Sequence, residues 1–203
     1  MDATLFKNIC ALTRDSFQDG TVVNDVLTEL VTLAKTIGFQ HTMETGCGRT
    51  TLLMSHLSPD HLVFSPGGRN MNGLQGAGLL CEGTVTFHEA PSLKTLPNFQ
   101  FKHPLDFVLL DGAHGFPFAH VEYFFTYPHI RTGGILVVDD IRIPAVYQLF
   151  EFLRHDAMFR LNKIIAKNTA FFVRTGEPTT DPYRECWNKQ AFNLKFHPVE
   201  VTA

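Results

Sequence analysis

The sequence HTMETGCGRTTLLMSHL, residues 41–57, predicts a strand at His41–Thr45, a glycine turn, and a helix over about Arg49–Leu57. Gly46 allows a sharp turn, and Gly48 lets a ligand approach the backbone without a Cβ atom in the way. A dinucleotide site would carry a third glycine at the start of the helix, which is missing here. An acid also stands two residues before the first glycine. The pattern favours a bound cofactor without a diphosphate, and the alternative is a tight strand-to-helix turn with no ligand.

On both sides of this turn, short apolar runs alternate with amphipathic segments, which is typical of βα units around a parallel sheet. Two continuous apolar runs end in acids, as buried central parallel strands do. The last two strands have a short connection, which predicts an antiparallel hairpin at one edge. The further strands are expected at about His61–Ser65, Thr84–His88, Leu105–Leu110, Ile135–Val138, Arg160–Ala166 and Ala170–Arg174. Two helices should carry Phe118, Val121 and Phe125, and Val146, Leu149, Phe150 and Leu153.

Two N-terminal helices precede the first strand. Leu5, Ile9 and Leu12 have helical spacing, and a longer apolar stripe from Val23 to Ile37 stops at Gly38. Residues 66–78 hold five glycines, which predicts a mobile loop or a poorly formed helix. The interpretation is one domain over residues 1–203, with N-terminal helices at 1–37, a core at 38–174 and a surface tail at 175–203.

Composition excludes several classes of protein. The 203 residues carry a net charge of −3 and no block of Lys and Arg, so nucleic acid is a poor candidate substrate. The longest apolar runs have four residues, far short of a membrane span. Four cysteines (Cys10, Cys47, Cys81 and Cys186) form no paired motif, which favours a reduced, cytoplasmic chain. The expected partner is a small molecule, and a homodimer stays open.

Three acids follow the two apolar strands: Asp111 ends the first, and Asp139 and Asp140 end the second. Parallel strands open onto the same edge of a sheet, so these carboxylates should meet there and repel one another unless a cation or protons neutralise them. Oxygen ligands select a hard cation such as magnesium, which would polarise an acceptor hydroxyl. The alternative is helix capping or cofactor contact without metal. His114, three residues after Asp111, is a candidate general base or cofactor contact.

These motifs carry a resemblance. ETGCG, together with DFVLLDGAHG at residues 106–115 and RTGGILVVDD at residues 131–140, resembles the class I methyltransferases. The similarity is to the small-molecule O-methyltransferases related to macrocin and other sugar O-methyltransferases, and it covers about Gly38–Asp156. It implies a doubly wound α/β fold whose seven-stranded, mostly parallel sheet has an antiparallel last strand. It also implies S-adenosylmethionine bound beyond the carboxyl ends of the strands.

The resemblance also implies roles for individual residues. The metal-binding Asp and the later Asp-Asp pair of the sugar enzymes match Asp111, Asp139 and Asp140. Ser92 lies in the loop beside the adenine ring, and Ser65 stands where the family commonly has an acid that binds the ribose hydroxyls. The complete set implied to bind the cofactor is Glu44, Thr45, Gly46, Gly48, Ser65, Ser92, Asp111 and Gly112.

The expected function is methyl transfer from S-adenosylmethionine to a hydroxyl of a small molecule, such as a sugar or a phenol, assisted by Mg²⁺. Asp111 and His114 are the expected catalytic residues. Ser65 and the glycine-rich loop leave open a related enzyme with non-methylation chemistry on the same scaffold. A non-catalytic binding module is the alternative from another class, and the acid cluster argues against it because unpaired carboxylates are costly without a use.

Overall fold

A computed structural model describes residues 2–12, 22–181, 183–184, 188 and 190–196 of the chain. Seven strands form one sheet in the order β3-β2-β1-β4-β5-β7-β6. Strands β3, β2, β1, β4 and β5 run parallel, whereas β7 is antiparallel to both of its neighbours. The strands are β1 His41–Thr45, β2 Asp60–Phe64, β3 Val85–His88, β4 Leu105–Leu110, β5 Ile130–Val138, β6 Phe159–Ile165 and β7 Thr169–Arg174.

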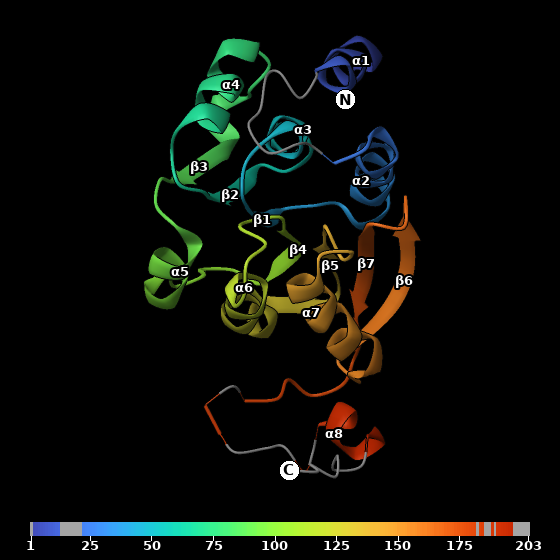
Figure 1. Ribbon diagram of the computed structural model, residues 1–203. Coiled ribbons are helices and arrows are strands. Elements are labelled where there is room, and N and C mark those ends of the chain that lie inside the picture. Colours follow the sequence, from blue (N-terminus) through green and yellow to red (C-terminus); the bar gives the residue numbers. More distant parts are fainter. Residues whose placement is uncertain (1, 13–21, 182, 185–187, 189, 197–203) are drawn as a thin grey trace.

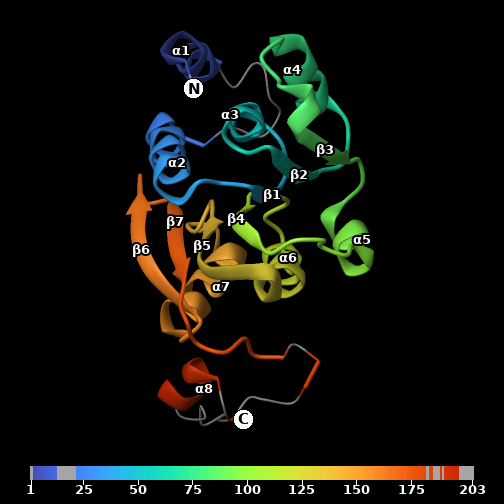
Figure 2. The ribbon, with the colours of Figure 1, turned by 180° about the vertical axis from the view of Figure 1, so that it is seen from behind.

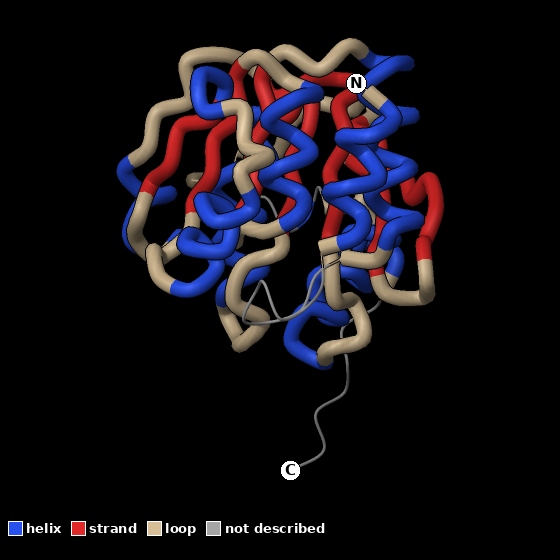
Figure 3. The backbone as a smooth tube through the Cα atoms, turned by 90° about the horizontal axis from the view of Figure 1, so that it is seen from above, coloured by secondary structure: helices blue, strands red, loops and turns tan. Residues whose placement is uncertain are grey.

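Helices cover both faces of this sheet (Figures 1 and 2). One layer contains α1 Ala3–Ala11, α2 Asn24–Ile37, α3 Arg49–Leu57 and α4 Arg69–Ala77. Figure 3 looks onto this layer from above, with the strands beneath it. The other layer contains α5 Ser92–Thr95, α6 Phe118–Thr126 and α7 Pro144–His155, and the short α8 Ala191–Lys195 packs against α7. Short 3₁₀ turns lie at Glu82–Thr84, Leu96–Asn98 and Tyr127–His129.

The central strands are apolar on both faces because each face is covered by helices. Successive side chains of a strand point to opposite faces. Phe107 and Leu109 of β4 therefore pack with α2 and α3, whereas Val108 and Leu110 pack with α6 and α7. Strands β5 and β7 divide in the same way, so the molecule has two hydrophobic cores, one on each side of the sheet.

The predicted architecture is confirmed: a seven-stranded, mostly parallel, doubly wound sheet with N-terminal helices and an edge hairpin. The strand at His41–Thr45 and the helix at Arg49–Leu57 lie where they were predicted, and α2 ends at Gly38. The glycine-rich residues 66–78 contain α4, a regular helix of nine residues. Strand β5 begins at Ile130, five residues before the predicted start, and includes Gly133 and Gly134.

Helix α6 lies where a helix was expected and carries Phe118, Val121 and Phe125. Its fully buried face is formed by Ala119, Glu122, Tyr123 and Thr126. Helix α6 is apolar around most of its circumference, so hydrophobicity alone does not define which side faces the sheet.

The expectations about membrane spans and cysteines can be compared with the described residues. No helix among them is both long and apolar enough to span a membrane. Cys10, Cys47 and Cys81 are free cysteines, and Cys186 lies outside the described residues.

Candidate functional site

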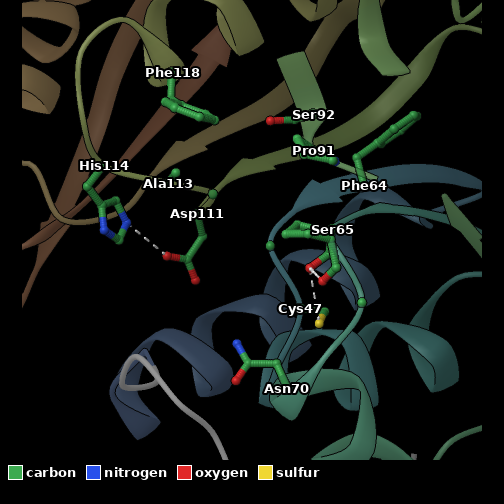
Figure 4. Close-up of a pocket in the computed structure, with 14 residues that line it drawn as sticks. Cys47, Phe64, Ser65, Asn70, Pro91, Ser92, Asp111, Ala113, His114 and Phe118 are labelled. Atoms are coloured by element: carbon green, nitrogen blue, oxygen red, sulfur yellow. Dashed lines mark hydrogen bonds and ion pairs between the residues drawn. The ribbon is translucent and has the colours of Figure 1, made fainter. Parts of the chain in front are cut away.

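The site lies at the carboxyl ends of β1 and β4, where the chain order of the sheet reverses. Helix α3 follows β1 on one face, and α6 follows β4 on the other, so a crevice opens between them. This crevice is a pocket with a volume of about 320 Å³ (Figure 4). Its walls are formed by Gly46, Cys47, Phe64, Ser65, Pro66, Gly67, Asn70, Pro91, Ser92, Asp111, Gly112, Ala113, His114 and Phe118.

Gly46 makes the turn after β1 fit against the end of β4. Its φ of 80° lies in the left-handed region, and its N–H donates to the carbonyl of Phe64 at 3.0 Å. A Cβ atom at this position would overlap the carbonyl oxygen of Asp111. Only glycine therefore lets the two strand ends approach each other so closely.

Glu44 holds this turn from behind and does not line the pocket. Its side chain is 1% exposed, and its carboxylate accepts hydrogen bonds from the hydroxyls of Thr50 (2.6 Å) and Thr51. His61 Nε2 lies 3.3 Å from the same carboxylate. The Thr51 hydroxyl also accepts from the Gly48 N–H at 3.0 Å. The structure thus places Glu44 and Gly48, both predicted to bind the cofactor, in the support of the turn rather than in the pocket wall.

On the other side of the pocket, Asp111, His114 and Asp140 form an acidic group. His114 Nε2 lies 3.5 Å from Asp111 Oδ1 and 3.3 Å from Asp140 Oδ2. Ligand atoms of the three side chains lie within 4.8 Å of one another, and each side chain is about one-third exposed or less. Two carboxylates and one imidazole at this spacing can hold a divalent cation.

Asp139 does not belong to this group, which differs from the predicted metal set. Its carboxylate is buried and accepts a hydrogen bond from the hydroxyl of Thr169 in β7. Asp140 has a φ of 55°, so the backbone turns sharply between the two acids. Asn168, in the turn between β6 and β7, donates to Asp140 Oδ1 at 2.7 Å. The edge hairpin therefore separates the two acids, holding one in the interior and directing the other toward His114.

The electrostatics of the acidic group reflect its burial and its mixture of charges. Burial raises the pKa of Asp111 to about 7, the hydrogen bond to His114 opposes this shift, and the Asp139 carboxylate reinforces it. The hydrogen bond to Asp111 raises the pKa of His114 despite partial burial, and Asp140 adds to the increase. A proton is therefore shared within the group near neutral pH.

Ser65, at the position of the expected ribose-binding acid, lies in the pocket wall. Its hydroxyl is 3.4 Å from Cys47 Sγ and 3.2 Å from the carbonyl of Pro66. Burial raises the pKa of Cys47 to about 11, so the thiol stays protonated and is a poor nucleophile.

Glu122 of α6 is a site residue that the sequence analysis missed. It is 1% exposed, and its carboxylate accepts from the hydroxyls of Ser92 (2.6 Å) and Thr45 (2.9 Å). The Thr45 hydroxyl accepts in turn from the N–H of Asp111 at 3.1 Å. A Cβ atom on Gly112 would overlap Glu122 Oε1. One carboxyl group therefore joins the end of β1, the start of α5 and the loop after β4.

A signal for Glu122 was present in the sequence. It is the single acid in the otherwise apolar and aromatic segment FAHVEYFFT, residues 118–126. It also shares a helical face with Ala119, Tyr123 and Thr126, which are buried. A lone acid on a buried helix face needs hydrogen-bond donors, and Ser92 and Thr45 provide them.

Of the predicted cofactor residues, the structure brings Gly46, Ser65, Ser92, Asp111 and Gly112 to the pocket wall. Thr45 lies behind the wall with Glu44 and Gly48. Among the predicted catalytic residues, Asp111 and His114 both line the pocket. Figure 4 shows them at one side of it, with Phe64, Pro91 and Ser92 gathered at the other.

Comparison with known proteins matches about half of the chain to a protein family. Residues 43–141 match a protein family described as "Methyltransferase domain". No curated protein matches the chain in sequence.

Solved structures share the fold at low identity. The O-methyltransferase TomG from Streptomyces achromogenes, involved in tomaymycin synthesis and solved in complex with SAM, is 18% identical with a TM-score of 0.67, covering 87% of this chain and 91% of its own. The SAH-bound methyltransferase PaMTH1 from Podospora anserina is 13% identical with a TM-score of 0.66. The alignment covers 86% of this chain and 89% of PaMTH1. An O-methyltransferase from Bacillus cereus, in complex with SAH, is 12% identical with a TM-score of 0.64. The alignment covers 86% of this chain and 92% of the Bacillus protein. The predicted resemblance to a methyltransferase domain is confirmed over residues 43–141, and the solved structures confirm the fold.

Proposed function

We propose that this chain, whose residues 43–141 match the methyltransferase domains, transfers the methyl group of S-adenosylmethionine to a hydroxyl of a small molecule. The observation that carries the proposal is the pocket itself. It joins the glycine turn after β1 to the acidic group of Asp111, His114 and Asp140, so a cofactor and a site for proton removal face one another. Methyl transfer to a hydroxyl needs both.

The glycine turn receives the cofactor. The backbone of Gly46 and the side chains of Ser65 and Ser92 form one end of the pocket, between aromatic and proline rings. The carboxylate of Asp111, in the pocket wall, would favour the cationic sulfonium of the cofactor over its neutral product. Solved neighbours of the same fold hold SAM or SAH, which supports this assignment.

The chemical step is an in-line displacement. The hydroxyl oxygen forms a bond to the methyl carbon while the carbon–sulfur bond breaks, and the sulfur keeps the electron pair. The hydroxyl proton passes to the acidic group, in which Asp111 and His114 have pKa values that suit proton exchange near neutral pH. The enzyme's main contribution is to hold the oxygen in line with the methyl group.

The acidic group also fits a divalent cation, because two carboxylates and an imidazole offer ligand atoms within 4.8 Å of one another. Asp111, His114 and Asp140 would hold it. Asp139, whose carboxylate accepts from Thr169, would support the strand end instead. A bound cation would acidify an acceptor hydroxyl and fix its position.

Calorimetry with S-adenosylmethionine and S-adenosylhomocysteine, with and without Mg²⁺ or Mn²⁺, tests the cofactor. Micromolar binding of either compound supports the proposal, and no binding at millimolar concentration rejects it. For the cation, turnover is measured with a panel of sugars and phenols in a chelator and after metal is restored. A strong, reversible loss of turnover with unchanged cofactor affinity supports the cation, whereas full activity in the chelator excludes it.

A further inference from the structure

The hydroxyl of Ser92 has a fixed direction, because it donates a hydrogen bond to the buried carboxylate of Glu122. Ser92 Oγ lies 2.6 Å from Glu122 Oε1, and both side chains are less than 5% exposed. An ionised carboxylate accepts hydrogen bonds and donates none. When Glu122 is ionised, the Ser92 proton is therefore committed to Glu122, and the Ser92 oxygen presents only lone pairs to the pocket.

The other hydroxyl that donates to Glu122, that of Thr45, cannot accept a hydrogen bond from a ligand. Thr45 Oγ1 donates to Glu122 Oε2 at 2.9 Å and accepts from the Asp111 N–H at 3.1 Å. It is fully buried behind the pocket wall. Ser92 is consequently the member of this network that lines the pocket and retains an accepting position for a ligand.

The surroundings of Ser92 suit a flat ring. Phe64, Pro91 and Phe118 lie around this end of the pocket, and Figure 4 shows Ser92 among them, away from His114. A planar heterocycle in this place would lie against apolar groups and would meet the Ser92 oxygen as a hydrogen-bond acceptor. It would need a hydrogen-bond donor on its edge, such as the exocyclic amino group of a 6-aminopurine.

We propose that Glu122 is a positioning residue that fixes the Ser92 hydroxyl as a hydrogen-bond acceptor and so makes the pocket selective for a 6-aminopurine over a 6-oxopurine. This inference rests on the proposed function, because it takes the purine to be that of S-adenosylmethionine. A 6-oxopurine presents a carbonyl to Ser92, and two facing acceptors repel each other and leave both without a partner.

The test compares two ligands by calorimetry at pH 8, where the carboxyl of Glu122 is ionised. They are S-adenosylhomocysteine and its deaminated analogue, S-inosylhomocysteine. The wild-type protein should bind the adenosyl compound at least about tenfold more tightly. A loss of this order is expected when a hydrogen-bond acceptor in the site faces a carbonyl in place of a donor. The ratio of the two affinities is the readout, since a general loss of structure weakens both ligands together.

Glu122→Met removes the carboxyl group at similar length, so Ser92 can rotate and donate to a carbonyl. The affinity ratio should fall toward one. Ser92→Ala should lower the ratio by a similar factor, and the double variant should lower it no further, because the two residues act through one hydroxyl. If Glu122→Met does not fold, Glu122→Asp, which is shorter by one methylene, withdraws the carboxylate from Ser92 and should lower the ratio in the same direction.

Asp156→Asn is the matched control, a buried carboxylate outside this pocket that accepts from the N–H of Met158. It should keep the wild-type ratio. A wild-type ratio near one, or an unchanged ratio in a folded Glu122 variant, overturns the inference while leaving the proposed function standing. Failure of the wild-type protein to bind either compound rejects the proposed function itself.

Discussion

The turn after β1 and the acidic group after β4 and β5 face each other across one pocket, and their polar atoms are satisfied in different ways. In the turn, the Glu44 carboxylate accepts from Thr50 and Thr51, and the Thr51 hydroxyl accepts from Gly48. In the acidic group, His114 Nε2 stands 3.5 Å from Asp111 and 3.3 Å from Asp140, and the side chains are partly open to the pocket.

The difference indicates that the turn and the acidic group have separate roles. Closed internal hydrogen bonds fix the turn before any ligand arrives, which lowers the entropic cost of binding the cofactor. The loosely paired acidic group can rearrange when a proton, a cation or an acceptor enters. The turn should therefore be sensitive to substitutions that alter its shape, and the acidic group to substitutions that alter its charge.

The largest effect is expected from Gly46→Ala. The new Cβ atom would overlap the carbonyl oxygen of Asp111, and the φ of 80° disfavours alanine. We expect a loss of about 3–4 kcal/mol in the free energy of unfolding, as for other strained backbone positions, together with loss of cofactor binding. Urea denaturation and calorimetry measure the two effects.

Gly48→Ala is the control for the same turn. A Cβ atom at Gly48 would have no neighbour within 4 Å, so the free energy of unfolding should change by less than about 1 kcal/mol. Equal destabilisation by the two alanines would show that the close approach of β1 and β4 does not set the shape of the turn.

The second expectation concerns Glu122, which connects the two regions through Thr45 and the loop of Gly112. Burial raises the pKa of Glu122 to about 7 from the usual 4.5, although Ser92 and Thr45 oppose the shift. The folded protein therefore holds this proton more strongly than the unfolded chain. The associated stability is fully present below pH 4.5 and is lost as the pH rises through 7.

Glu122→Gln does not titrate, so it serves as the reference. Between about pH 4.5 and pH 8, the free energy of unfolding of the wild-type protein should fall relative to that of the variant by about 3 kcal/mol. Urea denaturation at several pH values gives this difference. Parallel pH profiles for the two proteins would mean that the carboxyl of Glu122 ionises normally.

The third expectation separates the two neighbouring acids. Asp140→Asn removes a charge from the acidic group, and turnover should fall by about 100-fold with little change in cofactor affinity, as for the loss of a group that assists proton removal. Asp139→Asn should mainly lower the stability of the fold, since the Asp139 carboxylate accepts a hydrogen bond from Thr169. Steady-state kinetics and thermal unfolding distinguish the two. A larger loss of turnover in Asp139→Asn would reverse the roles assigned to them.

The smallest effect is expected from Ser65→Asp. If the cofactor's ribose lies beside Ser65, a carboxylate should bind its hydroxyls more strongly, by roughly 1 kcal/mol or up to tenfold in affinity. Ser65→Asn, of equal size but uncharged, is the comparison. Weaker binding of S-adenosylmethionine to the aspartate variant than to the asparagine variant would place the ribose elsewhere.

Much of the fold could be predicted because its signals are local. The apolar run at Leu105–Leu110 is typical of a buried strand, and the glycines after His41–Thr45 are typical of a turn. The start of β5 was missed because Gly133 and Gly134 indicate a turn when the neighbouring strand is not known. The two glycines lie within β5, and a Cβ atom on Gly134 would crowd the Leu105 carbonyl oxygen at 3.0 Å.

The site was less predictable because it depends on contacts between distant residues. Asp111 and Asp140 could be placed at one edge of the sheet, since parallel strands end there together. The separation of Asp139 from Asp140 depends on the hairpin turn at Asn168, and the role of Glu122 depends on which side of α6 faces the sheet. Neither is encoded in the spacing of the acids themselves.

The close approach of Gly112 to Glu122 has a consequence for how relatives of this protein can diverge. A Cβ atom on residue 112 would collide with the Glu122 carboxyl, so a larger residue there requires either a shorter residue at position 122 or a Glu122 carboxyl displaced from Ser92 and Thr45. The two positions should therefore covary among homologues. Lineages that keep Glu122 with its two hydrogen bonds should keep glycine at position 112.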